Sequence, residues 1–286
     1  MKLKVLLLGS GGMAGQMLKI ELQKLKGQIE LTDIARNNVI SEPTIELDVK
    51  DISQLKFIIE NNDFDYVINC IGLLNKNAES KPSDAIFINA YLPHFLAEIT
   101  TSSRTKIIHL STDCVFSGFK GGYTENDLKD GIGYYSQTKS LGEIDNKKDL
   151  TIRTSIIGPD LNKNGIGLLN WFLNQNSRVN GFGKVYWSGV TTLELTRYIL
   201  KIIIESKCPT GIIHLTNNNK ISKYDLLSII RDEFNMDVVE LVDTDSYISD
   251  KSFLNTRTDT FQNVSSYNQM ISELKYWMVK ELNWDI

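Results

Sequence analysis

The chain begins with a short apolar segment that runs directly into a cluster of glycines. Val5-Leu6-Leu7-Leu8 is followed by Gly9-Ser10-Gly11-Gly12-Met13-Ala14-Gly15, and residues 13–25 then carry apolar side chains at helical spacing. A continuous apolar run that ends in glycine is typical of a parallel strand buried on both faces. A strand, a glycine turn and a helix in this order predict the first βα unit of a nucleotide-binding sheet.

Short apolar strands continue to alternate with helices along most of the chain. We expect strands at residues 29–34, 66–71, 107–110, 150–157 and 211–216, and helices at 55–60, 86–100, 135–144 and 191–206. This alternation predicts the α/β class, with a Rossmann-like doubly wound parallel sheet. After about residue 217 the pattern is less regular, which favours a smaller, mixed α/β region there.

The composition is that of an ordinary globular enzyme. With 286 residues, 42% of them hydrophobic and 23% charged, the chain can bury a substantial core. A net charge of −4 without a basic block argues against a nucleic acid polymer as partner. The cysteines Cys70, Cys114 and Cys208 are few and far apart, which favours reduced thiols and a cytoplasmic location. The apolar run at residues 5–8 is too short for a membrane span, so no membrane partner is expected.

The glycine loop is suited to a dinucleotide pyrophosphate. Gly9, Gly12 and Gly15 form a GxxGxxG pattern, and Gly11 also allows a GxGxxG pattern. Glycines permit a tight turn, close approach of the backbone to phosphate and close packing of helix on sheet. Met13 opens the helix, whose free N–H groups would face the phosphates. The alternative is a glycine-rich turn that binds nothing.

Two residues, one at the end of the second expected strand and one just after it, favour different dinucleotides. Asp33 stands where an acid would bind the adenosine ribose 2′-hydroxyl, as NADH requires. Arg36 would instead meet the 2′-phosphate of NADPH. Asp48 and Val49 follow a later short strand and are candidates to border the adenine, although a solvated acid explains Asp48 equally well.

A tyrosine and a lysine four residues apart predict a proton donor. Tyr135 and Lys139 share one face of an expected helix, where the ammonium would lower the pKa of the phenol and make it a usable general acid. Two other pairs have this spacing, Tyr247/Lys251 and Tyr276/Lys280. Only Tyr135 lies in the nucleotide-binding half, so we interpret the other two as packing tyrosines with solvated lysines.

Thr112 follows the expected strand at residues 107–110, at the edge where open α/β sheets bind ligands. Its hydroxyl can orient a substrate carbonyl toward Tyr135. The alternative is a local turn or helix cap. His94, His109 and His214 have no metal-ligand spacing with the cysteines, and we expect no metal.

Together these residues resemble the extended short-chain dehydrogenase/reductase superfamily, and within it the dTDP-4-dehydrorhamnose reductase family of nucleotide-sugar 4-ketoreductases. The matching stretches are residues 9–15, 69–70, 78–80 with Pro82, 89–90, 111–118, 135–143, 153–155 and 189–192. The resemblance extends from residue 1 to about residue 220 and then fades. It divides the chain into an NAD(P)-binding Rossmann domain, residues 1–155 plus about 189–217, and a substrate-binding region, residues 156–188 and 218–286.

The resemblance implies a role for each matching residue. Thr112, Tyr135 and Lys139 would be catalytic, and Lys139 would also hold the nicotinamide ribose. The other residues implied to contact the cofactor are Cys70, Ile71, Gly72 and Asn89, and those implied to contact the substrate are Asp113, Cys114, Arg153, Ser155, Trp187 and Thr191. The cofactor would be NADPH, or in some members NADH. The partner would be a nucleotide-sugar substrate, and a homodimer stays an option for the assembly.

The implied activity is NAD(P)H-dependent reduction of a nucleotide-activated 4-keto-6-deoxy sugar for cell-surface polysaccharide biosynthesis. The family usually has tyrosine where this chain has Cys114, and the segment at residues 70–74 also differs, which suggests a different sugar. A 4,6-dehydratase would carry a second carboxylate after Asp113, and Cys114 stands there instead. A nucleotide-sugar 4-epimerase and a non-catalytic NADP-binding regulatory subunit remain as alternatives.

Overall fold

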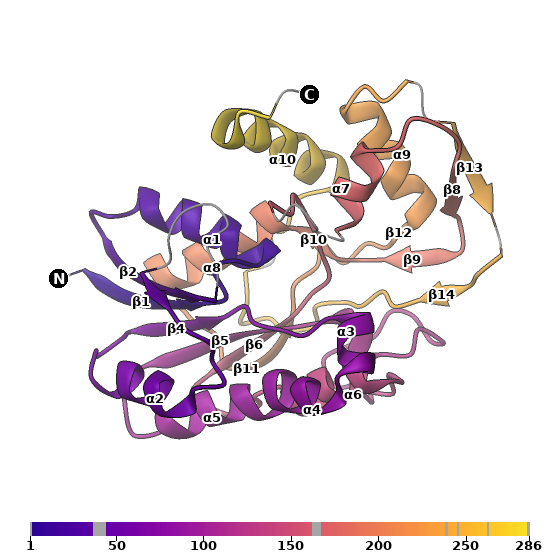
Figure 1. Ribbon diagram of the computed structural model, residues 1–286. Helices are drawn as coiled ribbons and strands as arrows, with labels where there is room; N and C mark the ends of the chain where they lie inside the picture. Colours follow the sequence, from indigo (N-terminus) through magenta and orange to yellow (C-terminus); the bar gives the residue numbers. More distant parts are fainter. Residues whose placement is uncertain are drawn as a thin grey trace.

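The computed structural model describes residues 2–36, 44–161, 167–237, 240–244, 246–261 and 263–284. Its centre is a seven-stranded parallel sheet with the strand order β11-β6-β5-β4-β1-β2-β3 (Figure 1). The strands are β1 (Leu3–Leu8), β2 (Ile29–Ala35), β3 (Ile45–Glu46), β4 (Tyr66–Asn69), β5 (Lys106–Ser111), β6 (Leu150–Arg153) and β11 (Gly211–His214). The order reverses between β1 and β4, as in a doubly wound sheet, and this confirms the predicted fold class.

Helices cover both faces of this sheet (Figure 1). The helices α1 (Met13–Lys24) and α8 (Thr192–Ile204) lie on one face, and α2 (Ile52–Glu60), α5 (Leu92–Ile99) and α6 (Tyr134–Leu141) lie on the other. Val5 and Leu7 belong to the core under the first face, whereas Leu6 and Leu8 belong to the core under the second. Because successive residues of a strand point to opposite faces, the uninterrupted apolar run of β1 fills both cores.

Two expected elements are divided in the structure. The helix expected at residues 86–100 consists of a π-helical turn, η1 (Ile86–Tyr91), followed by α5, and it is preceded by the short helices α3 (Asn75–Ser80) and α4 (Pro82–Ala85). The strand expected at residues 150–157 is β6 followed by β7 (Ile156–Ile157), which leaves the main sheet to pair with β10 (Val190–Thr191). The break occurs at Thr154, whose hydroxyl donates to the Leu215 carbonyl at 3.1 Å.

The remaining elements form small sheets beside the carboxyl edge of the main sheet (Figure 1). The strand β8 (Val179–Phe182) pairs with β13 (Leu241–Thr244), and β9 (Val185–Trp187) pairs with β12 (Ile221–Ser222) and β14 (Ser249–Asp250). The helices of this part are α7 (Leu168–Leu173), α9 (Lys223–Glu233) and α10 (Tyr267–Leu282). Ile152 of the main sheet, Leu226 of α9 and Met278 of α10 belong to one apolar cluster, so the two parts share a core. No helix of the described residues has the length and apolar character that a membrane crossing needs.

The glycine loop packs α1 tightly against the end of β1. Gly9 has a φ of +85°, a conformation that favours glycine, and its carbonyl accepts a hydrogen bond from the Gly12 N–H at 3.0 Å. A Cβ on Gly15 would lie 2.1 Å from the Gly9 oxygen, whereas a Cβ on Gly12 would lie 3.5 Å from that atom. Glycine is therefore required at position 15, because a Cβ there would clash with the backbone of the loop. A Cβ at position 12 would not clash in this way.

We predict that Gly15→Ala destabilises the protein by at least about 3 kcal/mol, because the backbone of residues 9 and 10 must move to admit the methyl group. Gly27→Ala is the matched control, since a Cβ there meets nothing within 4 Å. It should change the free energy of unfolding by less than about 1 kcal/mol. Denaturant unfolding of both variants measures the difference. Equal losses of stability would show that the close contact at Gly15 does not exclude a methyl group.

Candidate active site

A cavity of about 580 Å³ lies at the carboxyl ends of the central strands, beside the point where the strand order reverses. Many of the residues predicted to bind a cofactor line it: Gly9, Gly11, Gly12, Arg36, Asp48, Val49, Cys70, Ile71 and Gly72. Open α/β sheets bind ligands at such a crevice, and the N-terminus of α1 opens there. The cavity therefore fits the elongated shape and the phosphates of a dinucleotide.

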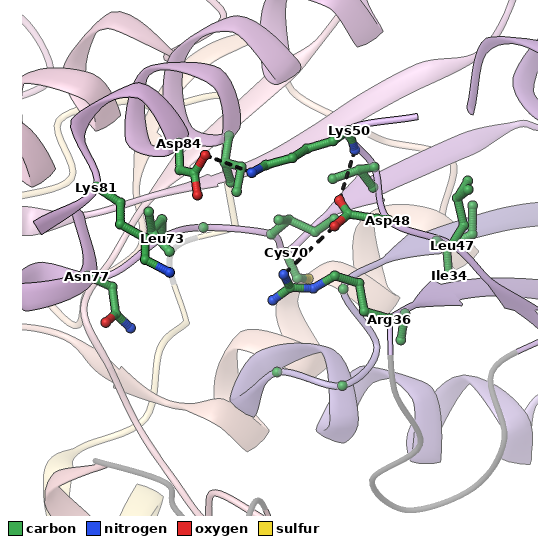
Figure 2. A pocket seen from close by; sticks show the side chains of 18 residues that line it. Ile34, Arg36, Leu47, Asp48, Lys50, Cys70, Leu73, Asn77, Lys81 and Asp84 are labelled. Atoms are coloured by element: carbon green, nitrogen blue, oxygen red, sulfur yellow. Dashed lines mark hydrogen bonds and ion pairs between the residues drawn. The ribbon is translucent and has the colours of Figure 1, made fainter. Parts of the chain in front are cut away.

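Three cationic side chains line this cavity (Figure 2). Arg36 is exposed and lies 4.0 Å from Asp48, and the Lys50 ammonium lies 2.7 Å from Asp84. Lys81 is the third cation of the lining. Arg36 stands directly after β2, where a dinucleotide would place its adenosine ribose. This end of the cavity thus carries positive charge where a phosphate on that ribose would lie.

The structure contradicts the prediction that Asp33 binds the adenosine ribose. Its side chain is 2% exposed and points beneath the glycine loop rather than into the cavity. Oδ2 accepts from Ser10 Oγ at 2.6 Å and lies 3.0 Å from the Lys19 ammonium, while Oδ1 accepts from the hydroxyl and the backbone N–H of Thr44. Both oxygens are therefore used inside the protein, and Asp33 anchors the loop instead.

Asn89 also has a structural role rather than the predicted contact with cofactor. It lies fully buried in the π-helical turn η1, where its amide exchanges hydrogen bonds of 2.8 and 2.9 Å with the backbone of Leu73. Its nitrogen also lies 3.2 Å from the Thr138 hydroxyl of α6. Asn89 thus joins the cavity wall to the helix that carries Tyr135. Met13 and Gly15 are likewise absent from the described lining of the cavity, and they begin and pack α1.

Thr112 and Tyr135 interact with each other at the carboxyl end of β5. Thr112 directly follows β5 and caps a short 3₁₀ turn, η2 (Asp113–Val115), by accepting from the Cys114 N–H at 3.1 Å. Its hydroxyl donates to Asp113 Oδ1 at 3.0 Å. Burial raises the pKa of Tyr135, with further increases from Cys114 and Asp113, while hydrogen bonding to Thr112 acts in the opposite direction. The phenol is therefore protonated at neutral pH.

Lys139 lies one helical turn after Tyr135 and is almost fully buried. Its ammonium donates to the Leu110 carbonyl at 2.6 Å and lies 3.4 Å from His109 Nε2. Burial lowers the pKa of Lys139 to about 8, although Glu143 and Cys70 raise it. We expected the ammonium to lower the pKa of Tyr135, and this is wrong for the described arrangement, because burial of the phenol dominates.

A buried ion pair supports the helix that carries Tyr135 and Lys139. The Glu143 carboxylate accepts from Arg153 Nε at 2.7 Å and Nη2 at 2.8 Å, and it also accepts from Ser111 Oγ at 2.7 Å. Arg153 is 1% exposed, so the prediction that it contacts substrate is wrong. Sequence reasoning gave no role to Glu143. Its position four residues after Lys139, within the helix expected at residues 135–144, was the available signal, although α6 ends at Leu141.

Two further residues predicted to contact substrate are internal. Trp187 is buried in the core, where its ring lies 5.7 Å from that of Tyr267. Thr191 caps α8 by accepting from the Glu194 N–H at 3.2 Å, and its side chain is 2% exposed. Both serve packing and helix formation rather than the substrate contacts predicted for them. Ser155 is half-buried between β6 and β7, and its carbonyl accepts from the Val190 N–H at 2.9 Å.

Cys114 and Asp113 are close enough to Tyr135 to raise the pKa of its phenol, and their contact with substrate stays a prediction. Burial raises the pKa of the Cys114 thiol to about 11, with a further increase from Asp113. The thiol is therefore neutral at working pH and is not an activated nucleophile. No group of three or more potential metal-ligating side chains occurs among the described residues.

Residues 2–252 match the family model described as the RmlD substrate binding domain. The chain belongs to this family. The agreement covers the sheet, the glycine loop and the helix of Tyr135, and it confirms the resemblance seen in the sequence.

The chain is also similar to individual proteins. The dTDP-4-dehydrorhamnose reductase of Aggregatibacter actinomycetemcomitans is 29% identical over 80% of this chain and 79% of its own. Methionine adenosyltransferase 2 subunit beta of Xenopus tropicalis is 22% identical over 82% of this chain and 72% of its own. A crystal structure of dTDP-4-dehydrorhamnose reductase from Bacillus anthracis in complex with NADP superposes with a TM-score of 0.81, covering 96% of this chain and 99% of that one at 22% identity. At that identity the superposition shows a shared fold.

We predict that Arg153→Met destabilises the protein by about 3 kcal/mol or more, because it leaves the Glu143 carboxylate buried without its main counter-charge. The double variant Arg153→Met with Glu143→Gln should recover part of this loss, since no unpaired charge remains. Thermal and denaturant unfolding measure both effects. Unchanged stability together with weaker substrate binding would instead support the substrate contact that the sequence predicted for Arg153.

Proposed function

We propose that this protein is an NAD(P)H-dependent reductase that converts a nucleotide-activated 4-keto-6-deoxy sugar to the corresponding alcohol. One observation supports the proposal. Cys70, which lines the cavity suited to a dinucleotide, directly follows β4, and the neighbouring strand β5 ends just before Thr112 and accepts a hydrogen bond from Lys139 at Leu110. Thr112 and Tyr135 lie on the same side of the sheet edge. We infer that the proton donor Tyr135 faces the reactive side of a bound nicotinamide ring.

The lining of the cavity supports NADPH as the preferred cofactor. Gly9, Gly11 and Gly12 would hold the pyrophosphate with the N–H groups at the start of α1, because no side chain stands in the way. Arg36 would contact the 2′-phosphate, and Lys50 and Lys81 would add positive charge. Asp33, which would repel that phosphate, is neutralised by Lys19 beneath the loop. When bound, NADPH supplies the hydride that reduces the ketone.

Each catalytic side chain then has a definite task. Tyr135 holds its proton on the phenol oxygen until the substrate oxygen gains negative charge and accepts it. Thr112 orients the phenol and the substrate oxygen by hydrogen bonding. Lys139 is positively charged below about pH 8 and, as the family resemblance implies, would hold the nicotinamide ribose beside Tyr135. The chain performs no covalent step, so positioning should supply most of the rate enhancement.

The names of relatives support the sugar substrate and the pathway. Besides the reductase named above, the family includes proteins of polysaccharide biosynthesis, and we infer that the product enters a cell-surface polysaccharide. Cys114 stands beside Tyr135, where its small side chain widens the sugar site relative to the tyrosine usual in the family. We therefore infer a sugar with a bulkier substituent than rhamnose carries.

We predict that Tyr135→Phe lowers kcat/KM by at least about 100-fold, because the proton donor is lost while the ring and its packing remain. Oxidation of NADPH with a panel of nucleotide-linked 4-keto-6-deoxy sugars measures the rate. Affinity for NADPH should stay within a few-fold of wild type. Tyr276→Phe is the matched control, since Tyr276 is 70% exposed on α10 and also precedes a lysine by four residues.

Two outcomes would contradict the proposal. Retained turnover in Tyr135→Phe would show that another group donates the proton. Wild-type protein that purifies with bound nucleotide and interconverts nucleotide sugars without net oxidation would instead be a 4-epimerase, which uses the same three residues but keeps its cofactor.

The cofactor preference has a separate test. Arg36→Ala should weaken NADPH binding by about tenfold while NADH binding changes less than about twofold, because only NADPH carries the 2′-phosphate that the guanidinium contacts. Arg104→Ala is the control, since Arg104 is an exposed arginine that precedes β5 at the opposite edge of the sheet. Calorimetric titration with each cofactor measures the ratio. An equal loss for both cofactors would place Arg36 away from the 2′-phosphate.

A further inference from the structure

A series of buried polar groups connects the wall of the cofactor cavity to Lys139. Ile71, which lines the cavity, donates its backbone N–H to Asn69 Oδ1 at 3.1 Å. Asn69 Nδ2 lies 3.2 Å from His109 Nδ1, and His109 Nε2 lies 3.4 Å from the Lys139 nitrogen. We name these four residues the buried network. Asn69 and His109 are fully buried, so the protein itself must supply their hydrogen-bond partners.

Regular elements hold the side chains of the network in place. Asn69 is the last residue of β4, and His109 is its register partner on β5. Because register partners on adjacent strands point to the same face of a sheet, the amide and the ring lie side by side. The helix α6 covers this face and brings Lys139 to the ring, where its nitrogen also donates to the Leu110 carbonyl at 2.6 Å.

Each contact in the network needs one donor and one acceptor. A backbone N–H only donates, so Ile71 takes the oxygen of the Asn69 amide, and the amide nitrogen then donates to His109 Nδ1. Burial, together with the charge of Lys139, holds the pKa of His109 well below its usual range, so the ring is neutral and carries one proton. With Nδ1 accepting, that proton resides on Nε2 and points toward Lys139.

The charge state of Lys139 decides whether the last contact is satisfied. A neutral amine accepts from His109 Nε2–H and still donates to Leu110, so all contacts are complete. An ammonium can only donate. It leaves two donors facing each other at one of the three contacts, whichever ring tautomer and whichever amide orientation is adopted. Because a buried donor without an acceptor is costly, the network disfavours the ammonium.

We propose that Asn69 and His109 are positioning residues that favour the neutral amine of Lys139 over its ammonium. Two neighbours act in the opposite direction, since Glu143 after α6 and Cys70 after β4 raise the pKa of Lys139. The other titratable and charged groups around the network are Tyr135 on the same helix, His94 of α5, and Arg153 and Lys129 beside Glu143.

The tautomer of His109 tests the inference directly in the wild-type protein. Long-range ¹H–¹⁵N NMR spectra of protein labelled in its three histidines distinguish a ring protonated on Nε2 from one protonated on Nδ1. At about pH 9.5, above the Lys139 pKa of about 8, His109 should carry its proton on Nε2. A proton on Nδ1 at this pH would overturn the inference.

His214 is the internal control in the same spectrum. Its Nε2 lies 3.1 Å from Arg153, which only donates, and its Nδ1 lies 2.9 Å from the Leu254 carbonyl, which only accepts. His214 should therefore carry its proton on Nδ1, opposite to His109.

The nearly isosteric variant Asn69→Asp reverses the direction of the network. Its carboxylate accepts from both Ile71 N–H and His109 Nδ1–H, so Nε2 is free to accept from the ammonium. We expect the ring proton to move to Nδ1, and the pKa of Lys139, followed by the ¹³C shift of its side chain, to rise by at least about one pH unit. The added negative charge alone would raise the pKa without moving the ring proton, and that result would refute the inference.

Asn170→Asp is the matched control for the change of an amide to a carboxylate. Asn170 is half-buried on α7, and its Oδ1 also accepts from a backbone N–H, that of Asp160 at 2.9 Å. Its amide nitrogen donates to a backbone carbonyl rather than to a histidine. This variant should leave the pKa of Lys139 and the histidine tautomers unchanged.

The consequence for catalysis rests on the proposed function, in which Lys139 would hold the nicotinamide ribose. The alkaline limit of kcat/KM for ketone reduction should move to higher pH in Asn69→Asp, because the ammonium persists to higher pH. The NMR measurements need neither substrate nor turnover. The expected tautomers in a protein without reductase activity would support the inference and refute the proposed function. An active reductase with His109 protonated on Nδ1 at about pH 9.5 would refute the inference alone.

Discussion

The buried carboxylate of Glu143 holds together the elements that form the catalytic site. It accepts hydrogen bonds from Arg153 at the end of β6 and from Ser111 at the end of β5, directly before Thr112. Glu143 itself follows α6, the helix of Tyr135 and Lys139. Two strand ends and one helix are therefore fixed by a single charge. Because a buried carboxylate is tolerated only with such partners, the arrangement of the site and the stability of the fold depend on the same contacts.

The same cluster extends through His214 to the segment near the C-terminus. Arg153 Nη1 lies 3.1 Å from His214 Nε2, and His214 Nδ1 lies 2.9 Å from the Leu254 carbonyl. Burial lowers the pKa of His214 to about 4, so the ring is neutral at working pH. Since a guanidinium can only donate, Nε2 must accept and the single ring proton resides on Nδ1, where it donates to Leu254. The backbone at Leu254 is thus linked to the ion pair that supports the catalytic helix.

Sequence patterns predicted the sheet and part of the site, and the failures have a common cause. The apolar run of β1 and the glycines after it depend on near neighbours in the chain, and the Tyr135/Lys139 spacing depends on one helix. Asp33, Arg153 and Trp187 were misassigned because their partners are distant in sequence. Lys19 neutralises Asp33 under the loop, Glu143 pairs with Arg153, and Tyr267 packs on Trp187. The position of a residue in a strand shows which edge of the sheet it occupies. It does not show whether an oppositely charged residue from a distant part of the chain lies inside the protein and pairs with it there.

Burial shifts the pKa values of the two titratable groups of the catalytic helix in opposite directions. It raises the pKa of Tyr135, which keeps the phenol protonated and ready to donate, and it lowers the pKa of Lys139 to about 8. A further drop in the pKa of Lys139 would discharge the ammonium at neutral pH. Glu143 opposes that drop, because its negative charge raises the pKa of Lys139. Arg153 in turn keeps Glu143 ionised by lowering the pKa of that carboxyl. The charge that holds the fold together therefore also keeps the catalytic lysine charged below about pH 8.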